Sequence, residues 1–500
     1  MAILIGFTIL WTLAIQVVAS VFNKSMLVPF HDKPRVFILS DISNEPDDQE
    51  SLTRYLLYSN QFQTEGIVAV TSTWLTDEVH PEAMMSVINA YGNVTSNLNR
   101  HAPLGSPYPS GDHVRSLVRK GAATYGMKAV GKDIPLSDGG KLLLERLQDE
   151  TDEPLWVLAW GGTNVLAQVL YKIHENYFST KAKAMRSKLR VYTISDQDDT
   201  GAWIRQQYPD IFYISSIHGW NQYGLAAWIG ISGEDYYGED AGGPDFSKVT
   251  HKWLHDNIQI RPYGKAAYPD YAYIMEGDTP TFLYLIQNGL GVREHPDYGS
   301  WGGRYSKVNP STVLNFNHYS DAADRVLGKN NHTYISNRAT IWRWRNAFQN
   351  DFAARMQWSL PANMSKPNHH PVVSINGSTG PVLLNLTVEA GSTVTLDASA
   401  TSDPDGDALT FNWFQYKEPG STDWNVEAQV PQLNISTSNG GRLAQMPIPA
   451  EKVSCDGEGA NPSGCWLLHL ILEVTDNGHH PLTSYRRVLL QTTNTTQTSA

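Results

Sequence analysis

Residues 36–57 read VFILSDISNEPDDQESLTRYLL, and this stretch decides the fold of the larger part of the chain. The apolar run Val36–Leu39 predicts a buried strand that ends at Asp41, and Asp47 and Asp48 open an amphipathic stretch that predicts a helix. Neighbouring carboxylates repel one another unless a cation or a proton lies between them. The stretch therefore predicts a site for a hard metal ion, for a hydroxyl-rich ligand, or for both. Helix capping is the simpler alternative for one of the three aspartates.

The alternation of short β-branched runs and longer amphipathic stretches continues over residues 34–360. Strands are predicted at Gly66–Val70, Leu155–Ala159 and Arg190–Ile194, and a helix is predicted at Val165–Leu170. This order predicts an α/β domain with a mostly parallel sheet and helices on both faces. In such domains ligands bind at the carboxyl ends of the strands.

The composition changes at residues 361–371, PANMSKPNHHP, which predict a linker. Short strands with turn signals between them then predict an all-β sandwich over residues 372–492, followed by a disordered tail at 493–500. The stretch TSDPDGDALTFNW at 401–413 resembles a turn of PKD or cadherin-like modules. Its residues Asp403, Asp405 and Asp407 form either a calcium site or, more commonly for such a turn, a polar hairpin with its own side-chain bonds.

Several features of the whole chain indicate secretion. Residues 1–20 are an apolar run closed by small residues, which predicts a cleaved signal peptide, although a basic start is missing. The mature protein is then expected to have no membrane segment. Cys455 and Cys465 are the only cysteines, and they are predicted to form one disulfide. N-x-S/T sequons, which indicate glycosylation, occur at Asn23, Asn93, Asn331, Asn363, Asn376, Asn385, Asn434 and Asn494.

The charge of the chain excludes one class of partner. The formal net charge of the 500 residues is −12, and no basic run is present. Proteins that bind nucleic acids neutralise phosphates with clustered Lys and Arg. A nucleic-acid partner is therefore not expected.

The carboxylate stretch also carries a family resemblance. Residues 38–48 resemble the D-x-D-P-G-x-D-D signature of inosine–uridine nucleoside hydrolases, and they resemble more closely the S-D-I-x-N-E-P-D-D-Q variant of a nucleoside hydrolase-like family often labelled cellulose-binding. The resemblance implies calcium ligands at Asp41 and Asp48 and sugar contacts at Asn44 and Glu45. Ser43 replaces the aspartate that usually acts as the base, and this leaves Asp47 as the predicted base.

Two later turns extend the resemblance. Residues 160–164, WGGTN, resemble a G-x-x-T-N turn, which implies that the Thr163 carbonyl binds calcium and that Asn164 contacts the ligand. Asp278 matches the last protein ligand of the calcium ion, but Gly277 stands where the family has a histidine that contacts the leaving group. This loss argues against a nucleobase leaving group. Ordinary starts of helices remain the alternative for both turns.

Aromatic and acidic turns supply further candidates for sugar binding, with loop packing or a solvated loop as the alternative. The function predicted is that of a secreted carbohydrate-active protein that hydrolyses N- or O-glycosidic bonds of plant-wall glycans. The alternative is a non-catalytic cellulose-binding or polysaccharide-binding protein with a vestigial site. The resemblance implies calcium as cofactor. The further candidates are Asp196, Asp198, His218, Trp220, Trp301 and Arg304.

Overall fold

The computed structural model describes residues 22–309, 316–421, 430–450 and 467–493. The predicted signal peptide, Cys455, Cys465 and almost all of the predicted tail lie outside these ranges. Within them, no helix combines the length and the apolar character needed to cross a bilayer.

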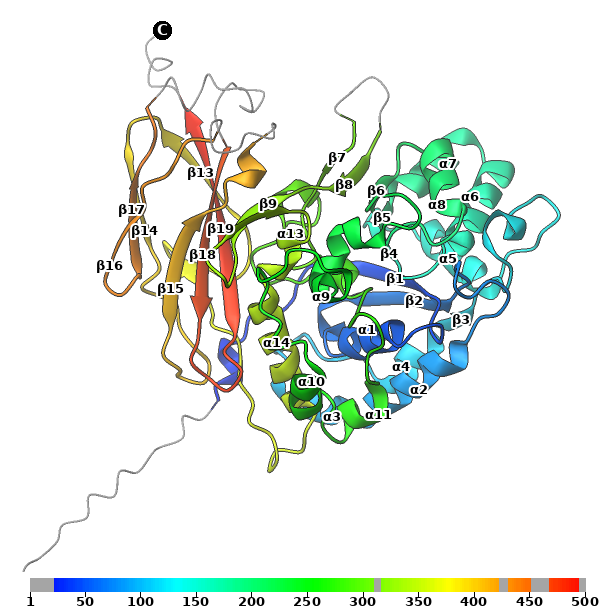
Figure 1. Ribbon diagram of the computed structural model, residues 1–500, viewed down its shortest axis with the longest axis horizontal. Coiled ribbons are helices and arrows are strands. Elements are labelled where there is room, and N and C mark those ends of the chain that lie inside the picture. The colour runs from blue at the N-terminus through cyan, green and yellow to red at the C-terminus, as the bar shows by residue number, and fades with distance from the viewer. Residues whose placement is uncertain (1–21, 310–315, 422–429, 451–466, 494–500) are drawn as a thin grey trace, which may run out of the picture.

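A mostly parallel sheet forms the centre of the first domain (Figure 1). Its described strands are β1 (Arg35–Ser40), β2 (Gln63–Ala69), β3 (Val118–Lys120), β4 (Leu155–Ala159), β5 (Leu189–Thr193), β6 (Phe212–Ser215), β7 (Tyr305–Lys307) and β8 (His318–Asp321). They lie in the order β3-β2-β1-β4-β5-β6-β8-β7, and only β7 runs antiparallel to its neighbour. The predicted α/β class is confirmed.

Helices cover both faces of this sheet (Figure 1). The described helices are α1 (Asp47–Leu56), α2 (Pro81–Gly92), α3 (Thr95–His101), α4 (Gly111–Ser116), α5 (Asp138–Gln148), α6 (Asn164–Asn176), α7 (Ser179–Ser187), α8 (Thr200–Gln207), α9 (Glu234–Tyr237), α10 (His251–Asn257), α11 (Tyr263–Ala267), α12 (Pro280–Leu283), α13 (Ala339–Trp342) and α14 (Arg345–Trp358).

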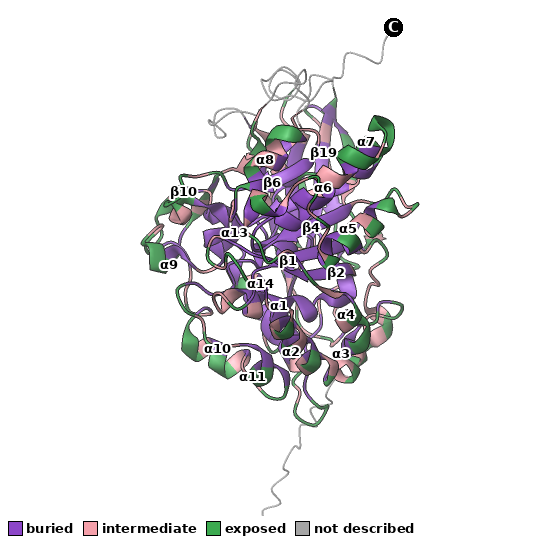
Figure 2. Cartoon of the chain, turned by 90° about the vertical axis from the view of Figure 1, so that its right-hand side faces the viewer, coloured by how far each residue is buried: buried purple, intermediate pink, exposed green. Residues whose placement is uncertain are grey.

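Strand β1 shows why its sequence is an unbroken apolar run. Val36 and Ile38 join the core formed with α1, α2 and α14, whereas Phe37 and Leu39 join the opposite core with α5 and α6. A strand covered on both faces needs apolar residues at every position rather than at alternate ones. Figure 2 shows the same arrangement as a buried centre inside a more exposed shell of helices.

The C-terminal part is a β-sandwich, as the sequence predicts. One sheet has the order β13-β19-β18-β15 and the other β14-β17-β16. The hairpins β9–β10 and β11–β12 precede these sheets. The bounds are β9 (Asp324–Leu327), β10 (Thr333–Ser336), β11 (Ser374–Ile375), β12 (Ser378–Thr379), β13 (Leu384–Glu389), β14 (Thr393–Asp397), β15 (Thr410–Gln415), β16 (Ser436–Ser438), β17 (Leu443–Pro447), β18 (Leu467–Thr475) and β19 (Thr483–Thr493).

The turn at 401–413 closes on itself in the structure. Asp403 accepts hydrogen bonds from the backbone N–H groups of Asp405 and Asp407, at 2.9 and 3.0 Å. These bonds form the polar hairpin that the sequence favours. The three carboxylates nevertheless have oxygen atoms within 4.8 Å of one another.

The sandwich packs firmly against the α/β domain through a buried charged cluster. Asp324 is fully buried and accepts hydrogen bonds from Arg304, Arg343 and Tyr416, at 2.7, 2.8 and 2.6 Å. Burial opposes ionisation of Asp324, but the two guanidinium groups hold its pKa below the usual value. Because Tyr416 follows β15 in the sandwich, this carboxylate ties the two domains together.

We predict that Asp324→Asn lowers the free energy of unfolding by about 3–5 kcal/mol, because it leaves the buried guanidinium group of Arg304 and the half-buried one of Arg343 without a charged partner. Denaturant unfolding followed by circular dichroism measures the change. Asp256→Asn is the control, since that residue forms an exposed pair with Lys252 and should leave the free energy of unfolding nearly unchanged. Equal effects of the two variants would contradict the role of Asp324.

Candidate functional site

The floor of the site forms where β1 meets α1. Every residue of β1 is buried, and Asp41 follows directly after its end. The chain then turns through Ser43, whose φ of 88° lies in the left-handed region, and enters α1 with Asp47 and Asp48 in the first turn. The amino end of a helix favours negative charge. This turn therefore places three carboxyl groups of one short segment at the carboxyl edge of the sheet.

A buried ion pair holds the loop that carries the fourth carboxyl group. Arg54 on α1 donates a hydrogen bond to Glu276 at 2.8 Å, and both side chains are fully buried. The backbone N–H of Glu276 donates to Glu50, also on α1, at 2.9 Å. Glu276 itself has a left-handed backbone, with φ of 55°. Helix α1 therefore fixes the loop that ends in Asp278.

The four carboxyl groups meet as a compact cluster. Oxygen atoms of Asp47, Asp48 and Asp278 lie within 4.8 Å of one another. Asp41 is close enough to Asp48 for its charge to raise the pKa of Asp48, and Asp48 accepts a hydrogen bond of 2.5 Å from the hydroxyl of Ser40. One oxygen of Asp278, Oδ2, is buried and has no hydrogen-bond partner among the described residues. Such an orphaned carboxylate oxygen is a fitting donor for a cation.

Burial and mutual repulsion raise the pKa values of the carboxyl groups in this cluster. Burial raises the pKa of Asp41 to about 6, and burial together with the charges of Glu45 and Asp41 raises the pKa of Asp47 to about 7. Burial and repulsion from the same cluster raise the pKa values of Asp48 and Asp278 well above the ordinary range. The site therefore binds protons or a cation in preference to remaining fully ionised and bare.

The cluster opens into a cavity of about 420 Å³. This volume falls in the usual range for small-ligand pockets. The cavity brings together six residues that the sequence analysis proposes, four of which form the carboxylate cluster and two of which are candidate sugar contacts. They are Asp41, Asn44, Glu45, Asp47, Asp48 and Asp278.

Other predicted residues lie beside the cavity without lining it. The Thr163 carbonyl accepts the first helical bond of α6, from the N–H of Ala167. Asn164 is fully buried and donates to Thr71 and to the carbonyls of Ala122 and Thr124. These contacts give both residues a structural role in joining α6 to neighbouring loops. Calcium binding by Thr163 and ligand contact by Asn164 remain predictions.

The acidic turn after β5 is also committed to local contacts. Asp196 forms a two-pronged ion pair with Arg205 on α8. Asp198 is buried and accepts hydrogen bonds from the backbone and the hydroxyl of Thr200. Asp198 thus caps the start of α8, and Asp196 ties the turn to the last turn of the same helix, which agrees with the simpler of the two alternatives for this turn.

His218 and Trp220 lie at the mouth of the cavity. His218 is hydrogen-bonded to Ser195 at 2.6 Å, and Ser195 accepts a further bond from Trp228, which lines the cavity. Trp220 is 54% exposed and stacks against Trp74, another lining residue. Both predicted residues therefore belong to the surroundings of the site.

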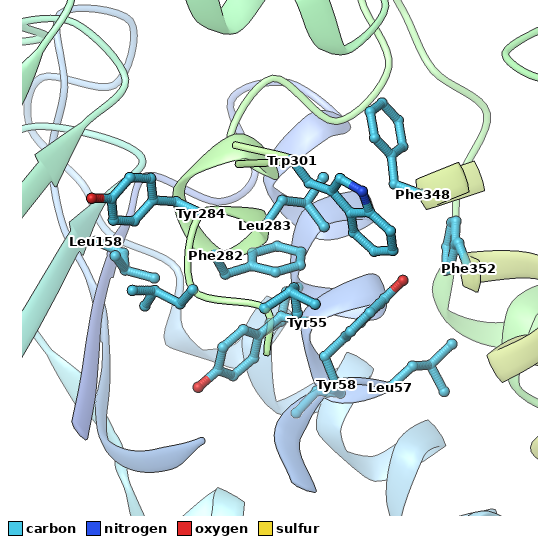
Figure 3. Close-up of a cluster of buried hydrophobic side chains, with 14 of the residues drawn as sticks. Tyr55, Leu57, Tyr58, Leu158, Phe282, Leu283, Tyr284, Trp301, Phe348 and Phe352 are labelled. Carbon is cyan, nitrogen blue, oxygen red and sulfur yellow. The ribbon is translucent and has the colours of Figure 1, made fainter. Parts of the chain in front are cut away.

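Trp301 and Arg304 correct the sequence-based assignment of sugar contacts. Trp301 is 1% exposed and packs in the hydrophobic core near Phe348, as Figure 3 shows. Arg304 is 6% exposed and pairs with Asp324 under the sandwich. Neither side chain lines the cavity, because the sandwich covers the turn that carries them. The sequence does not show which turns the sandwich covers, so it gives no indication that these two side chains are buried.

Sequence reasoning missed most of the cavity wall. Four of the missed residues carry a usable signal, because they follow β2, β4 or β5 at the sheet edge where ligands bind: Trp74, Trp160, Ile194 and Gln197. The others come from the segments 223–237 and 273–274, whose arrangement depends on long-range contacts. The missed lining residues are Trp74, Trp160, Ile194, Gln197, Tyr223, Trp228, Tyr236, Tyr237, Tyr273 and Ile274.

Gly277 has a steric reason in this site. A Cβ atom at this position would lie 2.7 Å from Oδ2 of Asp47 and 3.1 Å from Ile274. The loop thus approaches Asp47 so closely that a side chain at residue 277 would displace the carboxylate. The observed position of the Asp47 carboxylate therefore requires glycine at residue 277.

Family comparison agrees with this geometry. Residues 35–305 match the family described as "Cellulose-binding Sde182, nucleoside hydrolase-like domain". The chain belongs to this family. Residues 393–492 match the description "Cellulose-binding protein Sde0182, C-terminal domain". The resemblance to a nucleoside hydrolase-like, cellulose-binding family stated from the sequence is confirmed, and the second match extends it to the C-terminal part.

One solved structure is similar over nearly the whole chain. It is a nucleoside hydrolase-related hypothetical protein from Saccharophagus degradans that is associated with carbohydrate metabolism, with 29% identity, a TM-score of 0.73 and coverage of 92% of this chain and 100% of that one. No curated protein matches. The effectors XOO4466 and XopQ, the latter complexed with adenosine diphosphate ribose, have identities of 12% and 13% and TM-scores of 0.28 and 0.25. They cover 66% and 51% of this chain and 93% and 81% of their own, and they carry no argument.

We predict that Asp278→Asn stabilises the protein in chelator, and more so at pH 8 than at pH 5. The native pKa of Asp278 is raised above the unfolded value, so its ionisation costs stability as the pH rises above about 4. The gain at pH 8 should be about 1.4 kcal/mol for each pKa unit removed. Urea unfolding at both pH values measures it, with the exposed Asp235→Asn as control. The same pH slope in wild type and Asp278→Asn would contradict the argument.

Proposed function

We propose that the protein is secreted, binds a plant-wall glycan in the carboxylate cavity and hydrolyses a glycosidic bond there. The observation that carries the proposal is the cluster of four carboxyl groups, three of them buried and Asp47 half-buried, at the floor of an aromatic-walled cavity. Carboxylates bind sugar hydroxyls and stabilise the positive charge of an oxocarbenium-like transition state. The cellulose-binding description of the family and the carbohydrate association of its solved relative support the choice of ligand.

The exposure of the sequons supports secretion. An asparagine must be accessible to carry a glycan. All seven sequon asparagines within the described ranges are exposed, and they are Asn23, Asn93, Asn331, Asn363, Asn376, Asn385 and Asn434. This distribution suits a glycosylated extracellular protein.

The donor set of the cluster fits calcium. Asp47, Asp48 and Asp278 offer closely spaced oxygens, and Asp278 has one oxygen without a partner. Calcium takes oxygen ligands and favours carboxylates. When bound, it supplies the positive charge that keeps the carboxylates ionised and orients a water molecule and sugar hydroxyls.

Asp47 is the proposed general base. It lies within the cluster and lines the cavity, and bound calcium would hold its carboxylate in the ionised form that accepts a proton. A carboxylate has two oxygens, so Asp47 can bind a cation with one and accept the proton of the attacking water with the other. Ser43 is neutral and cannot take this role.

Glu45 is the proposed acid that protonates the leaving group. It lines the cavity, and partial burial raises its pKa. A carboxyl group with a raised pKa stays protonated at a higher pH and can therefore donate its proton to the leaving group. This assigns the two proton transfers to two different carboxyl groups at the cavity.

A non-catalytic binding protein is the second candidate. Ser43 and Gly277 stand where the nucleoside hydrolase pattern has an aspartate and a histidine, and both changes remove catalytic groups. A chain that keeps the cavity but has lost turnover would bind polysaccharide only.

We predict that Asp47→Asn lowers kcat/KM by about 100-fold or more, because it removes the base. The assay uses nucleosides and wall oligosaccharides, with pull-down on insoluble cellulose beside it and the exposed Asp235→Asn as control. Glu45→Gln should lose activity on natural glycosides but retain most of it on aryl glycosides, whose leaving groups need less protonation. If the wild type binds cellulose but turns over no substrate, the hydrolase proposal is wrong and the non-catalytic binding protein is the better candidate.

We predict that calcium raises the melting temperature of chelator-treated wild type and that Asp278→Asn loses this response. At 1,000 times its Kd, one bound ion stabilises the fold by about 4 kcal/mol. Because Asp403, Asp405 and Asp407 form another acidic group, Asp403→Asn is the matched control and should keep the pocket response. If Asp403→Asn abolishes the response and Asp278→Asn retains it, calcium binds at the 403–407 turn and not in the cavity.

A further inference from the structure

Aromatic side chains at the mouth of the cavity remain exposed in a way that the fold does not explain. Trp74 and Trp220 are each 54% exposed, and Tyr236 and Tyr273 are 56% and 59% exposed. Single exposed aromatic residues are common, but a group of them around a cavity marks a surface for an apolar ligand face.

Trp74 and Trp220 form one side of this mouth. Their rings stack with centroids 6.3 Å apart and an angle of 21° between the planes. Tyr223 contacts both, at 6.2 and 5.8 Å, and also contacts Trp228 at 6.2 Å. Because Trp228 lines the cavity and Trp220 does not, the aromatic surface continues from the cavity outward.

Three tyrosines form another part of the mouth. Tyr236 contacts Tyr237 at 4.9 Å and Tyr273 at 5.9 Å. Tyr273 has φ of 63°, a left-handed conformation that is unusual for an aromatic residue. This strain persists although the side chain is exposed, and it lies five residues before Asp278. Tyr273 is therefore held at the mouth by its loop and not by burial of its own ring.

The charge of the cavity limits the ligand further. Asp41, Glu45, Asp47, Asp48 and Asp278 line it, and none of the described lining residues is Lys or Arg. An anionic ligand, such as a chain of uronic acids, would find no positive side chain to pair with. A neutral ligand fits this wall.

We propose that Trp74, in the wall of the cavity, and Trp220, just beyond it, form a stacking platform at the mouth and that the ligand is a neutral glycan chain. One sugar occupies the carboxylate floor, and a following sugar lays its C–H face on the platform. The proposal rests on the proposed function and specifies its ligand: a chain rather than a single sugar or a nucleoside, and neutral rather than acidic. A nucleobase also stacks on aromatic rings, and the experiment separates the two.

The test measures affinity by calorimetry for β-linked gluco-oligosaccharides of one to six units, for oligogalacturonates and for nucleosides. We expect wild-type affinity to rise with the length of the neutral chain. Trp220→Ala should lower the ratio of six-unit to one-unit affinity about tenfold, and Trp74→Ala should do the same. Phe178→Ala is the matched control, because Phe178 is 90% exposed, immediately precedes α7 and does not line the cavity.

The outcomes distinguish this proposal from the proposed function. Glycan binding that Asp48→Asn abolishes, with a length ratio unchanged in Trp220→Ala, overturns the platform and leaves the carboxylate site standing. Tighter binding of nucleosides or oligogalacturonates than of neutral chains also overturns it. Absence of binding to every glycan overturns both proposals. Equal melting temperatures of Trp220→Ala and Phe178→Ala show that a loss is not caused by unfolding.

Discussion

Burying several carboxyl groups side by side is the constraint on which this structure depends. Asp41, Asp47, Asp48 and Asp278 are held together in a setting that raises their pKa values. Such an arrangement opposes folding unless protons, a cation or a ligand neutralise it. The fold must therefore supply the stability elsewhere, and it does so with two apolar cores on the two faces of the sheet.

A buried ion pair and a buried hydrogen bond hold the repelling carboxyl groups of the cluster in place. Arg54 pairs with Glu276 directly behind the site, and Glu50 accepts a hydrogen bond from the same loop. These contacts are buried, so breaking one partner would leave a charge without compensation. The loop of Asp278 cannot move away from α1 cheaply, and the site is held in place before any ligand arrives.

The sandwich belongs to the same structural unit. Tyr416, Ile471 and Tyr485 of the sandwich join the core that also contains α1 and α14. Arg487 donates to the carbonyls of Leu290 and Tyr298 across the boundary. The C-terminal domain thus supports the side of the α/β domain that carries Trp301 and Arg304, and it does not line the cavity.

The sequence alone determined the parts that are local. The apolar run of β1, its end at Asp41 and the acidic first turn of α1 follow from periodicity, from turn chemistry and from the preference of helix amino ends for negative charge. The α/β class and the sandwich follow from the order of such elements. The family resemblance added Asp278, which local pattern alone reads as an ordinary start of a helix.

Only the tertiary structure decided which distant residues meet. It placed Asp278 beside Asp47 through the Arg54–Glu276 pair, buried Trp301 under the sandwich and left Trp74 and Trp220 stacked at the mouth. An exposed and a buried tryptophan turn look alike in sequence, because burial depends on elements hundreds of residues away. That dependence on long-range packing is the physical reason why the carboxylate floor was predictable and the aromatic wall was not.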